Sequence, residues 1–143
     1  YFYWIHRFLH IPFLYKHVHA LHHRNINVGP WSGLSMHPVE HLIFLGSVMI
    51  HWIIAAHPVH ILFHLQYYAL TAATTHTGFE GVAVKDENRL TLGRFHHQMH
   101  HRYFECNYGS LEIPWDKFFG SFHDGTTEAD KLMKERRKRM LGT

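Results

Sequence analysis

The sequence has almost no cysteine and none of the short motifs that mark the common cofactor sites. Cys106 is the single cysteine, so no disulfide forms within the chain, and we interpret it as a packing residue in a reducing compartment. This scarcity excludes an iron–sulfur cluster and a CxxCH haem attachment motif. There is no GxGxxG fingerprint for a dinucleotide, and no HExxH motif to support a zinc hydrolase. Electrons for any redox reaction would therefore come from another protein.

Charged residues are missing from Leu42 to Thr75, a stretch of 34 residues. The stretch divides into Leu42–Ala56 and Ile61–Thr75, around a turn that contains Pro58. A helix as short as either segment is about 22 Å long, less than the roughly 30 Å apolar core of a bilayer, so two buried helices of a water-soluble bundle are an alternative. The absence of charge from both segments favours a helical hairpin in a membrane.

Such a hairpin places both of its ends, and therefore His76, on one side of the membrane. The basic run from Lys134 to Arg139 falls on the same side, which the positive-inside rule makes cytoplasmic, although such a run is also common on the solvated face of a terminal helix. We predict an all-α, integral membrane helical bundle of the endoplasmic reticulum or the bacterial inner membrane, with the hairpin joined to cytosolic helices. A formal net charge of +3 is too weak and too local to suggest nucleic acid.

Histidine, in contrast, is abundant, with 18 residues in 143. On an α-helix, residues three or four positions apart share a face, whereas adjacent residues diverge by about 100°. An HxxHH cluster can therefore direct its rings to two points. Imidazole is a common ligand of transition metals, and these histidines outnumber the four ligands of a structural zinc, so we predict a two-metal site. The clusters are His6-x3-His10, His19-x2-His22-His23 and His97-x2-His100-His101.

The rest of the pattern predicts helices joined by polar loops. The chain begins without Met, in an aromatic segment of membrane type, so we expect a fragment whose upstream membrane helices lie outside it. Besides the hairpin we expect helices over residues 1–10, 13–23, 92–104 and 127–141, loops over 25–35 and 78–88, and irregular structure over 107–124.

The histidine clusters are accompanied by further short motifs in a fixed order. These are His37-Pro38-Val39-Glu40, His76-Thr77-Gly78, Asn107-Tyr108-Gly109 and Trp115-Asp116-Lys117-Phe118-Phe119-Gly120. With them, the chain resembles the fatty acid hydroxylase superfamily, specifically its sterol desaturase-like branch. The resemblance covers one domain over residues 1–143, is strongest over 3–125, and leaves 126–143 as a basic C-terminal helix.

This resemblance implies a membrane oxidoreductase with a non-haem centre of two iron ions held by the histidines. Such enzymes use O₂ and two electrons to hydroxylate or desaturate an unactivated C–H position of a lipid, here a sterol or a fatty acyl chain. The family implies a cytochrome b5-like donor, or a ferredoxin with its reductase. By position, the implied metal ligands are His6, His10, His19, His22, His23, His76, His97, His100 and His101.

Some relatives place a further histidine where this chain has Ala72, so His37, His41 or water could complete the ligand set. His96 is a further candidate ligand, because it lies four residues before His100 and would share a helix face with it. Glu40 and Asp116 are candidate acceptors for the free ring N–H of ligand histidines, with helix capping or a surface salt bridge as the alternative for each.

A histidine-rich membrane protein that binds or transports metal without redox chemistry is the alternative function. Its ligands should face one another within the apolar span, whereas the clusters here lie outside the uncharged stretch.

Overall fold

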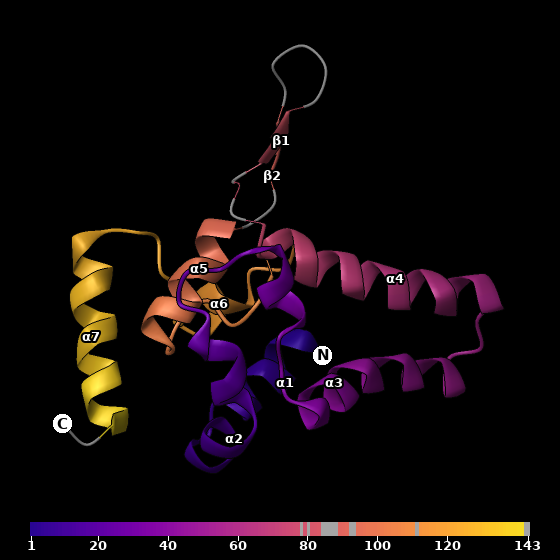
Figure 1. The fold of residues 1–143 in the computed structure, drawn as a ribbon, viewed down its shortest axis with the longest axis horizontal. Helices are drawn as coiled ribbons and strands as arrows, with labels where there is room; N and C mark the ends of the chain where they lie inside the picture. Colours follow the sequence, from indigo (N-terminus) through magenta and orange to yellow (C-terminus); the bar gives the residue numbers. More distant parts are fainter. Residues whose placement is uncertain (78, 80, 84–88, 92–93, 111, 142–143) are drawn as a thin grey trace.

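A computed structural model describes residues 1–77, 79, 81–83, 89–91, 94–110 and 112–141. This part of the chain is predominantly helical, which confirms the predicted helical class. It also contains one two-stranded antiparallel β-hairpin, which an all-α prediction does not include. Figure 1 shows the short helices gathered at the centre, with a helical hairpin, the β-hairpin and the last helix extending from them in three directions.

The first 24 residues form three short helices. Helix α1 (Phe2–Leu9) is followed by α2 (Pro12–His17), which Pro12 begins at the first helical position, where its missing N–H is not needed. The chain then tightens into the 3₁₀ helix η1 (His19–Arg24). The prediction of one α-helix over residues 13–23 is therefore wrong in its second half, where the turn contains about three residues rather than 3.6.

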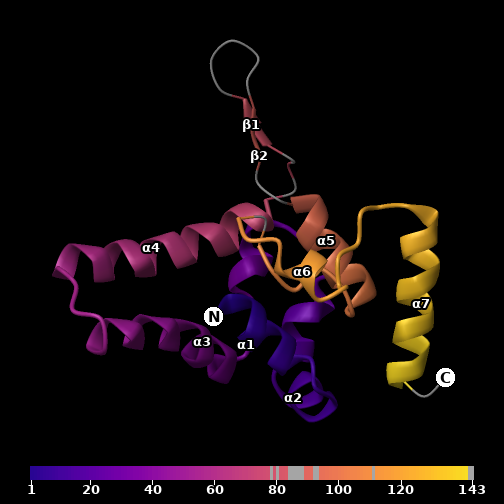
Figure 2. The same cartoon turned by 180° about the vertical axis from the view of Figure 1, so that it is seen from behind.

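The uncharged stretch forms the helical hairpin. The 3₁₀ helix η2 (Pro30–Leu34) leads into α3 (Pro38–Leu45), the 3₁₀ helix η3 (Gly46–Trp52) and the long α4 (Pro58–Thr75). Both views show the α3–η3 segment and α4 as the two arms of a hairpin, joined at the end far from the centre of the molecule (Figures 1 and 2). The prediction of a continuous helix over Leu42–Ala56 is wrong, because the α-helix changes to 3₁₀ at Gly46. The second predicted segment lies within α4.

Two histidines begin the helices of this hairpin in the same way. Nδ1 of His37 accepts the Val39 N–H, and Nδ1 of His57 accepts the Val59 N–H, each at 3.2 Å. A proline follows each histidine at the first helical position. These His-Pro pairs are therefore helix-starting elements, with the imidazole in the role that Asp or Ser more often fills.

The outer surface of the helical hairpin is strongly apolar. Leu42 is 71% exposed, Trp52 84% and Phe63 65%. In the part of the chain that the structure describes, no helix combines the length and the apolar character needed to cross a membrane.

Beyond α4, the strands β1 (Gly81–Ala83) and β2 (Arg89–Thr91) pair with Gly81 opposite Thr91. Part of the predicted loop over 78–88 is therefore a strand, and residues 78, 80 and 84–88 lie outside the described residues. Helices α5 (Arg94–Tyr103), α6 (Trp115–Phe118) and α7 (Thr127–Leu141) complete the fold. The bounds of α7 are those predicted.

The apolar core is small and divided. One cluster joins α1 to α3 through Leu9, Val18 and Phe44. A second joins α5 to α7 and contains Met99, Tyr103, Cys106 and Met133. Between them, the centre of the molecule is occupied by buried histidine side chains rather than by aliphatic ones.

Because Met133 is only 1% exposed and holds α7 against α5, we predict that Met133→Ala lowers the free energy of unfolding by about 2–5 kcal/mol. The neighbouring Leu132→Ala is the control, since Leu132 is 42% exposed and should cost only about 0.5 kcal/mol. Denaturant unfolding in detergent measures both, and equal losses would show that α7 is not packed in this way.

Candidate metal centre

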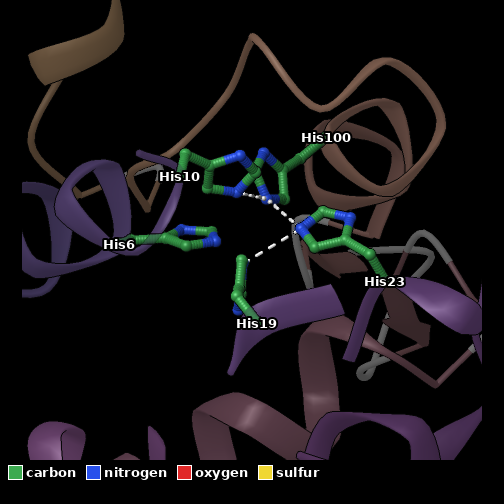
Figure 3. A group of neighbouring side chains, drawn as sticks. All are labelled: His6, His10, His19, His23 and His100. Carbon is green, nitrogen blue, oxygen red and sulfur yellow. Dashed lines mark hydrogen bonds between the residues drawn. The ribbon is translucent and has the colours of Figure 1, made fainter. Parts of the chain in front are cut away.

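Nine buried histidines form two adjacent groups whose ligand atoms converge. Within each group, the ligand nitrogen atoms all lie within 4.8 Å of one another. Figure 3 shows the rings of the larger group turned toward a common point. The five-histidine group contains His6, His10, His19, His23 and His100, and the four-histidine group contains His22, His76, His97 and His101. The nine implied ligands are thus brought together.

Each HxxHH cluster contributes to both groups. Its first and last histidines, four residues apart, enter the same group, and the middle histidine enters the other. In η1, His19 and His23 join the five-histidine group and His22 the four-histidine group. In α5 the assignment is reversed, because His97 and His101 join the four-histidine group and His100 the other. The predicted divergence of adjacent rings is what separates the groups.

Backbone carbonyl groups set the ring orientation of four of these histidines. A carbonyl only accepts hydrogen bonds, so the ring nitrogen that faces it, Nδ1, carries the proton. Nε2 then holds a lone pair directed into the group, which is the arrangement a metal-binding histidine requires. The pairs are His6 with Tyr108 at 2.7 Å, His22 with Ser35 at 3.3 Å, His76 with Ala72 at 2.6 Å and His100 with Cys106 at 2.6 Å.

Several Nε2 atoms in each group lie within hydrogen-bond distance of one another, and there are more such contacts than N–H protons and lone pairs can satisfy. The Nε2 atoms of His76, His97 and His101 form a triangle with sides of 3.0–3.2 Å. In the other group, Nε2 of His100 lies 3.2 Å from that of His10 and 3.1 Å from that of His23. Since His76 and His100 offer lone pairs there, hydrogen bonds cannot satisfy all these contacts. A cation at each point would accept the lone pairs, and an all-imidazole donor set suits a transition metal.

Burial keeps these imidazoles neutral. It lowers the pKa of His6 and of His76 to about 4, and the pKa of His22 to about 3. Burial also lowers the pKa values of the other six histidines well below the usual range. Neutral imidazole is the form that binds metal, so at neutral pH few protons compete for the site.

Glu40 lies directly beside the five-histidine group. Its Oε1 is 2.7 Å from Nδ1 of His19, and its side chain is fully buried. Burial raises the pKa of Glu40 to about 8, and Oε2 has no hydrogen-bond partner among the described residues. Such a carboxylate keeps its charge at neutral pH only if positive charge lies nearby, which a metal behind His19 would provide.

Asp116 lies elsewhere than the sequence predicts. Instead of facing one of the nine histidines, its carboxylate accepts the N–H groups of Tyr108 and Gly109 and the hydroxyl of Ser121, at 2.7–2.9 Å. These bonds hold the turn whose Tyr108 carbonyl orients His6. Asp116 therefore stabilises the loop beneath the five-histidine group.

Asn107 performs a similar role from a left-handed backbone conformation, with φ of 52°. Its side-chain amide donates to the His96 and His123 carbonyls and accepts the His123 N–H. Through the Asn107 side chain, the Asn-Tyr-Gly motif joins α5 to the segment after α6 by hydrogen bonds.

The three additional candidates lie outside both groups. His96 is about 100° around α5 from His97, and its Nε2 lies 3.8 Å from Asp116. His37 caps α3, and Nε2 of His41 is 3.2 Å from the Leu34 carbonyl oxygen. The i,i+4 spacing of His96 and His100 predicted a shared site, but the ring of His96 lies beside the Asp116 carboxylate instead.

Gly33, which the sequence marks only as a loop residue, allows η2 to approach α4 at the base of His76. A Cβ at this position would overlap the Ala72 carbonyl oxygen and lie 2.9 Å from Nδ1 of His76. The Ala72 carbonyl is the acceptor that orients His76. Backbone partners of this kind have no signature in a sequence.

A cavity of about 210 Å³ opens onto both histidine groups. Its polar lining includes five of the nine histidines and also His96, Glu40 and Glu112; the five are His6, His19, His22, His76 and His97. Much of the remaining wall is apolar, with Phe2 from α1, Phe44 from α3, Tyr68 and Ala72 from α4, and Met36 from the segment before α3. A small apolar ligand could therefore contact the metal-facing rings directly.

Comparison with protein families identifies the family of this chain. The profile of the family described as fatty acid hydroxylase matches residues 1–121, so the chain belongs to that family. This confirms the resemblance predicted from its motifs.

Similar curated proteins are sterol-modifying enzymes. The Delta(7)-sterol 5(6)-desaturase of Gibberella zeae is 33% identical, across 91% of this chain and 40% of its own length. Lathosterol oxidase of Rattus norvegicus is 37% identical, across 84% of this chain and 40% of its own. The Delta(7)-sterol 5(6)-desaturase of Leptosphaeria maculans is 31% identical, across 90% and 35%. The chain thus spans about two fifths of the length of these relatives. No solved structure matches it.

We predict that Gly33→Ala lowers bound metal to about half that of the parent protein, because the new methyl group displaces α4 and the carbonyl that orients His76. Gly29→Ala is the control, since a Cβ at Gly29 meets no atom within 4 Å. Elemental analysis of the purified variants measures the effect. Full metal content in Gly33→Ala would show that His76 does not depend on this contact.

Proposed function

We propose that this protein is an O₂-dependent lipid desaturase or hydroxylase that works with two iron ions held by the two histidine groups. The observation that supports this most directly is the convergence of nine neutral, buried imidazoles on two adjacent points. A pair of redox-active metals side by side suits the two-electron chemistry of O₂. Imidazole also resists the oxidation that thiolate ligands undergo.

In this proposal His6, His10, His19, His23 and His100 bind one iron ion, and His22, His76, His97 and His101 bind the other. The ions supply the oxidising power for breaking a strong C–H bond, and the protein supplies position and surroundings. Glu40 holds the His19 ring. The carbonyl groups of Tyr108, Ser35, Ala72 and Cys106 hold four others.

We propose a sterol as the substrate class and desaturation as the reaction. The relatives are named as sterol desaturases and a lathosterol oxidase. The cavity supports an apolar substrate, because a largely apolar wall beside the histidine rings suits the part of such a molecule that carries the reacting C–H bond. Desaturation removes two hydrogen atoms from the lipid. Together with two electrons and two protons, these reduce O₂ to two molecules of water.

We propose that the helical hairpin is embedded in a membrane, with the metal centre and α7 on the cytoplasmic side. The support is the uncharged stretch from Leu42 to Thr75 and the large exposed side chains along α3, η3 and α4. Such a surface is unusual on a water-soluble monomer. Because the cavity is partly walled by α4, a lipid could enter it from the apolar layer.

We expect His100→Ala to abolish lipid-dependent O₂ consumption and to lower bound iron, because His100 belongs to the five-histidine group and is fully buried. The loss should exceed the roughly 10–100-fold effect of removing an outer hydrogen-bond partner of a ligand. His60→Ala, at the exposed start of α4, is the control and should retain iron and activity. The measurements are iron per chain and O₂ uptake with sterol in detergent. One zinc per chain in the parent, with no O₂ uptake, would contradict the proposed function.

An external donor must supply the electrons, and we propose that a cytochrome b5-like protein, or a ferredoxin with its reductase, docks on α7. Substituting Arg136 or Arg137 would also disturb structural contacts, because Arg136 donates to the Gly120 carbonyl and Arg137 lies over the Phe104 ring at 4.7 Å. Lys131, Lys134 and Lys138 are exposed and better suited.

We predict that changing these three lysines to Gln slows reduction by cytochrome b5 about tenfold at low salt, because charge complementarity mainly accelerates association. Iron content should not change. Lys16→Gln, which removes a charge from α2, is the control. Stopped-flow reduction over a range of ionic strength measures the effect, and an unchanged rate in the triple variant would exclude α7 as the docking surface.

A further inference from the structure

The two histidine groups differ in the number of rings they offer. Among the described residues, one point is surrounded by five imidazoles and the other by four. Catalytic metal sites keep a coordination position that the protein does not fill, whereas closed sites do not. The smaller group is therefore the better candidate for a position that an outside molecule can occupy.

The surroundings of the five-histidine group point the same way. The Tyr108 ring lies 5.0–5.9 Å from the rings of His6, His10 and His100. The Tyr15 ring lies against His10, His19 and His23, and Phe104 covers His23 at 4.9 Å. Large aromatic rings thus lie against this group, and of its members only His10 lines a second cavity, of about 220 Å³, which is largely polar and separate from the apolar one.

The four-histidine group instead meets the cavity across small residues. Three of its four members, His22, His76 and His97, line the cavity. Gly33, Ala72 and Thr75, which lie around the base of His76, line it as well. Two members of the five-histidine group, His6 and His19, also reach the cavity, but they do so from a group that already has a fifth imidazole.

Ala72 is the residue whose size controls this space. It lies one helical turn before His76, and its backbone carbonyl orients that ring at 2.6 Å. Ala72 is among the residues that line the cavity. A larger side chain could occupy the space beside His76 without removing any of the nine imidazoles or the carbonyl bond.

We infer that the four-histidine group, when it holds a metal ion, keeps a coordination position open to the cavity for a small molecule of the O₂, nitric oxide or azide class, and that the small side chain of Ala72 keeps it open. This inference rests on the proposed two-metal function and adds to it which of the two groups receives the small ligand. Ala72 acts as a positioning residue, because it leaves space and binds nothing itself.

The test is azide binding to protein loaded with two cobalt(II) or two iron(III) ions, followed by absorption spectroscopy. The parent should bind one azide per chain. Ala72→Leu should weaken azide binding at least tenfold while the metal content stays at two per chain. Ala73→Leu is the matched control, because it makes the same change at the next residue of α4, which is not part of the cavity wall, and it should bind azide like the parent.

Unchanged azide affinity in Ala72→Leu with full metal content would overturn the inference and leave the two-metal site intact. A second pair of variants identifies the group directly. His101→Ala, in the four-histidine group, should lose one metal and azide binding together. His23→Ala, in the five-histidine group, should lose the other metal and still bind azide, and the reverse result would overturn the inference. A parent protein that binds no metal would contradict the proposed function instead, so the two failures are distinguishable.

Discussion

The structure depends on an arrangement that is unfavourable by itself, the burial of nine imidazole rings with their Nε2 atoms turned toward each other. Nδ1 atoms of His10, His23 and His101 have no hydrogen-bond partner among the described residues, and burial disfavours protonation of all nine rings. Each unsatisfied buried polar group costs about 1–3 kcal/mol. The apolar clusters at either side are small. A bound cation at each point would remove the conflict, which is why folding and metal binding are expected to be coupled.

This constraint explains why so much of the remaining polar structure serves to hold rings in place. Four rings are oriented by backbone carbonyls and one by Glu40. The loop that presents the Tyr108 carbonyl is itself held by Asp116 and Asn107. The Asn-Tyr-Gly and Trp-Asp motifs therefore belong to the metal centre, although none of their side chains is among the nine converging rings.

Helix α4 connects the metal centre to the apolar surface. His76 lies at its C-terminal end, and the preceding turn supplies the Ala72 carbonyl. The earlier turns form a wall of the cavity and the exposed face of the hairpin. A movement of this single helix would therefore change the metal ligands, the cavity and the exposed apolar surface together. Gly33 is the point at which the rest of the chain restrains it.

The sequence by itself predicted the helical class, the bounds of α7, the hairpin of two uncharged segments and the eight clustered histidines, whereas His76 entered the ligand set through the family resemblance. It did so because periodicity and spacing are local properties: rings four residues apart on an α-helix, such as those of His97 and His101 in α5, share a face. Only the tertiary structure decided that His96 turns away, that Asp116 binds a loop, and that the rings divide into groups of five and four. It also showed the 3₁₀ geometry of η1 and the close approach at Gly33. These features depend on which backbone groups of distant segments meet. Every residue has a backbone carbonyl, so no side-chain pattern predicts which one, such as that of Ala72, will orient a ring.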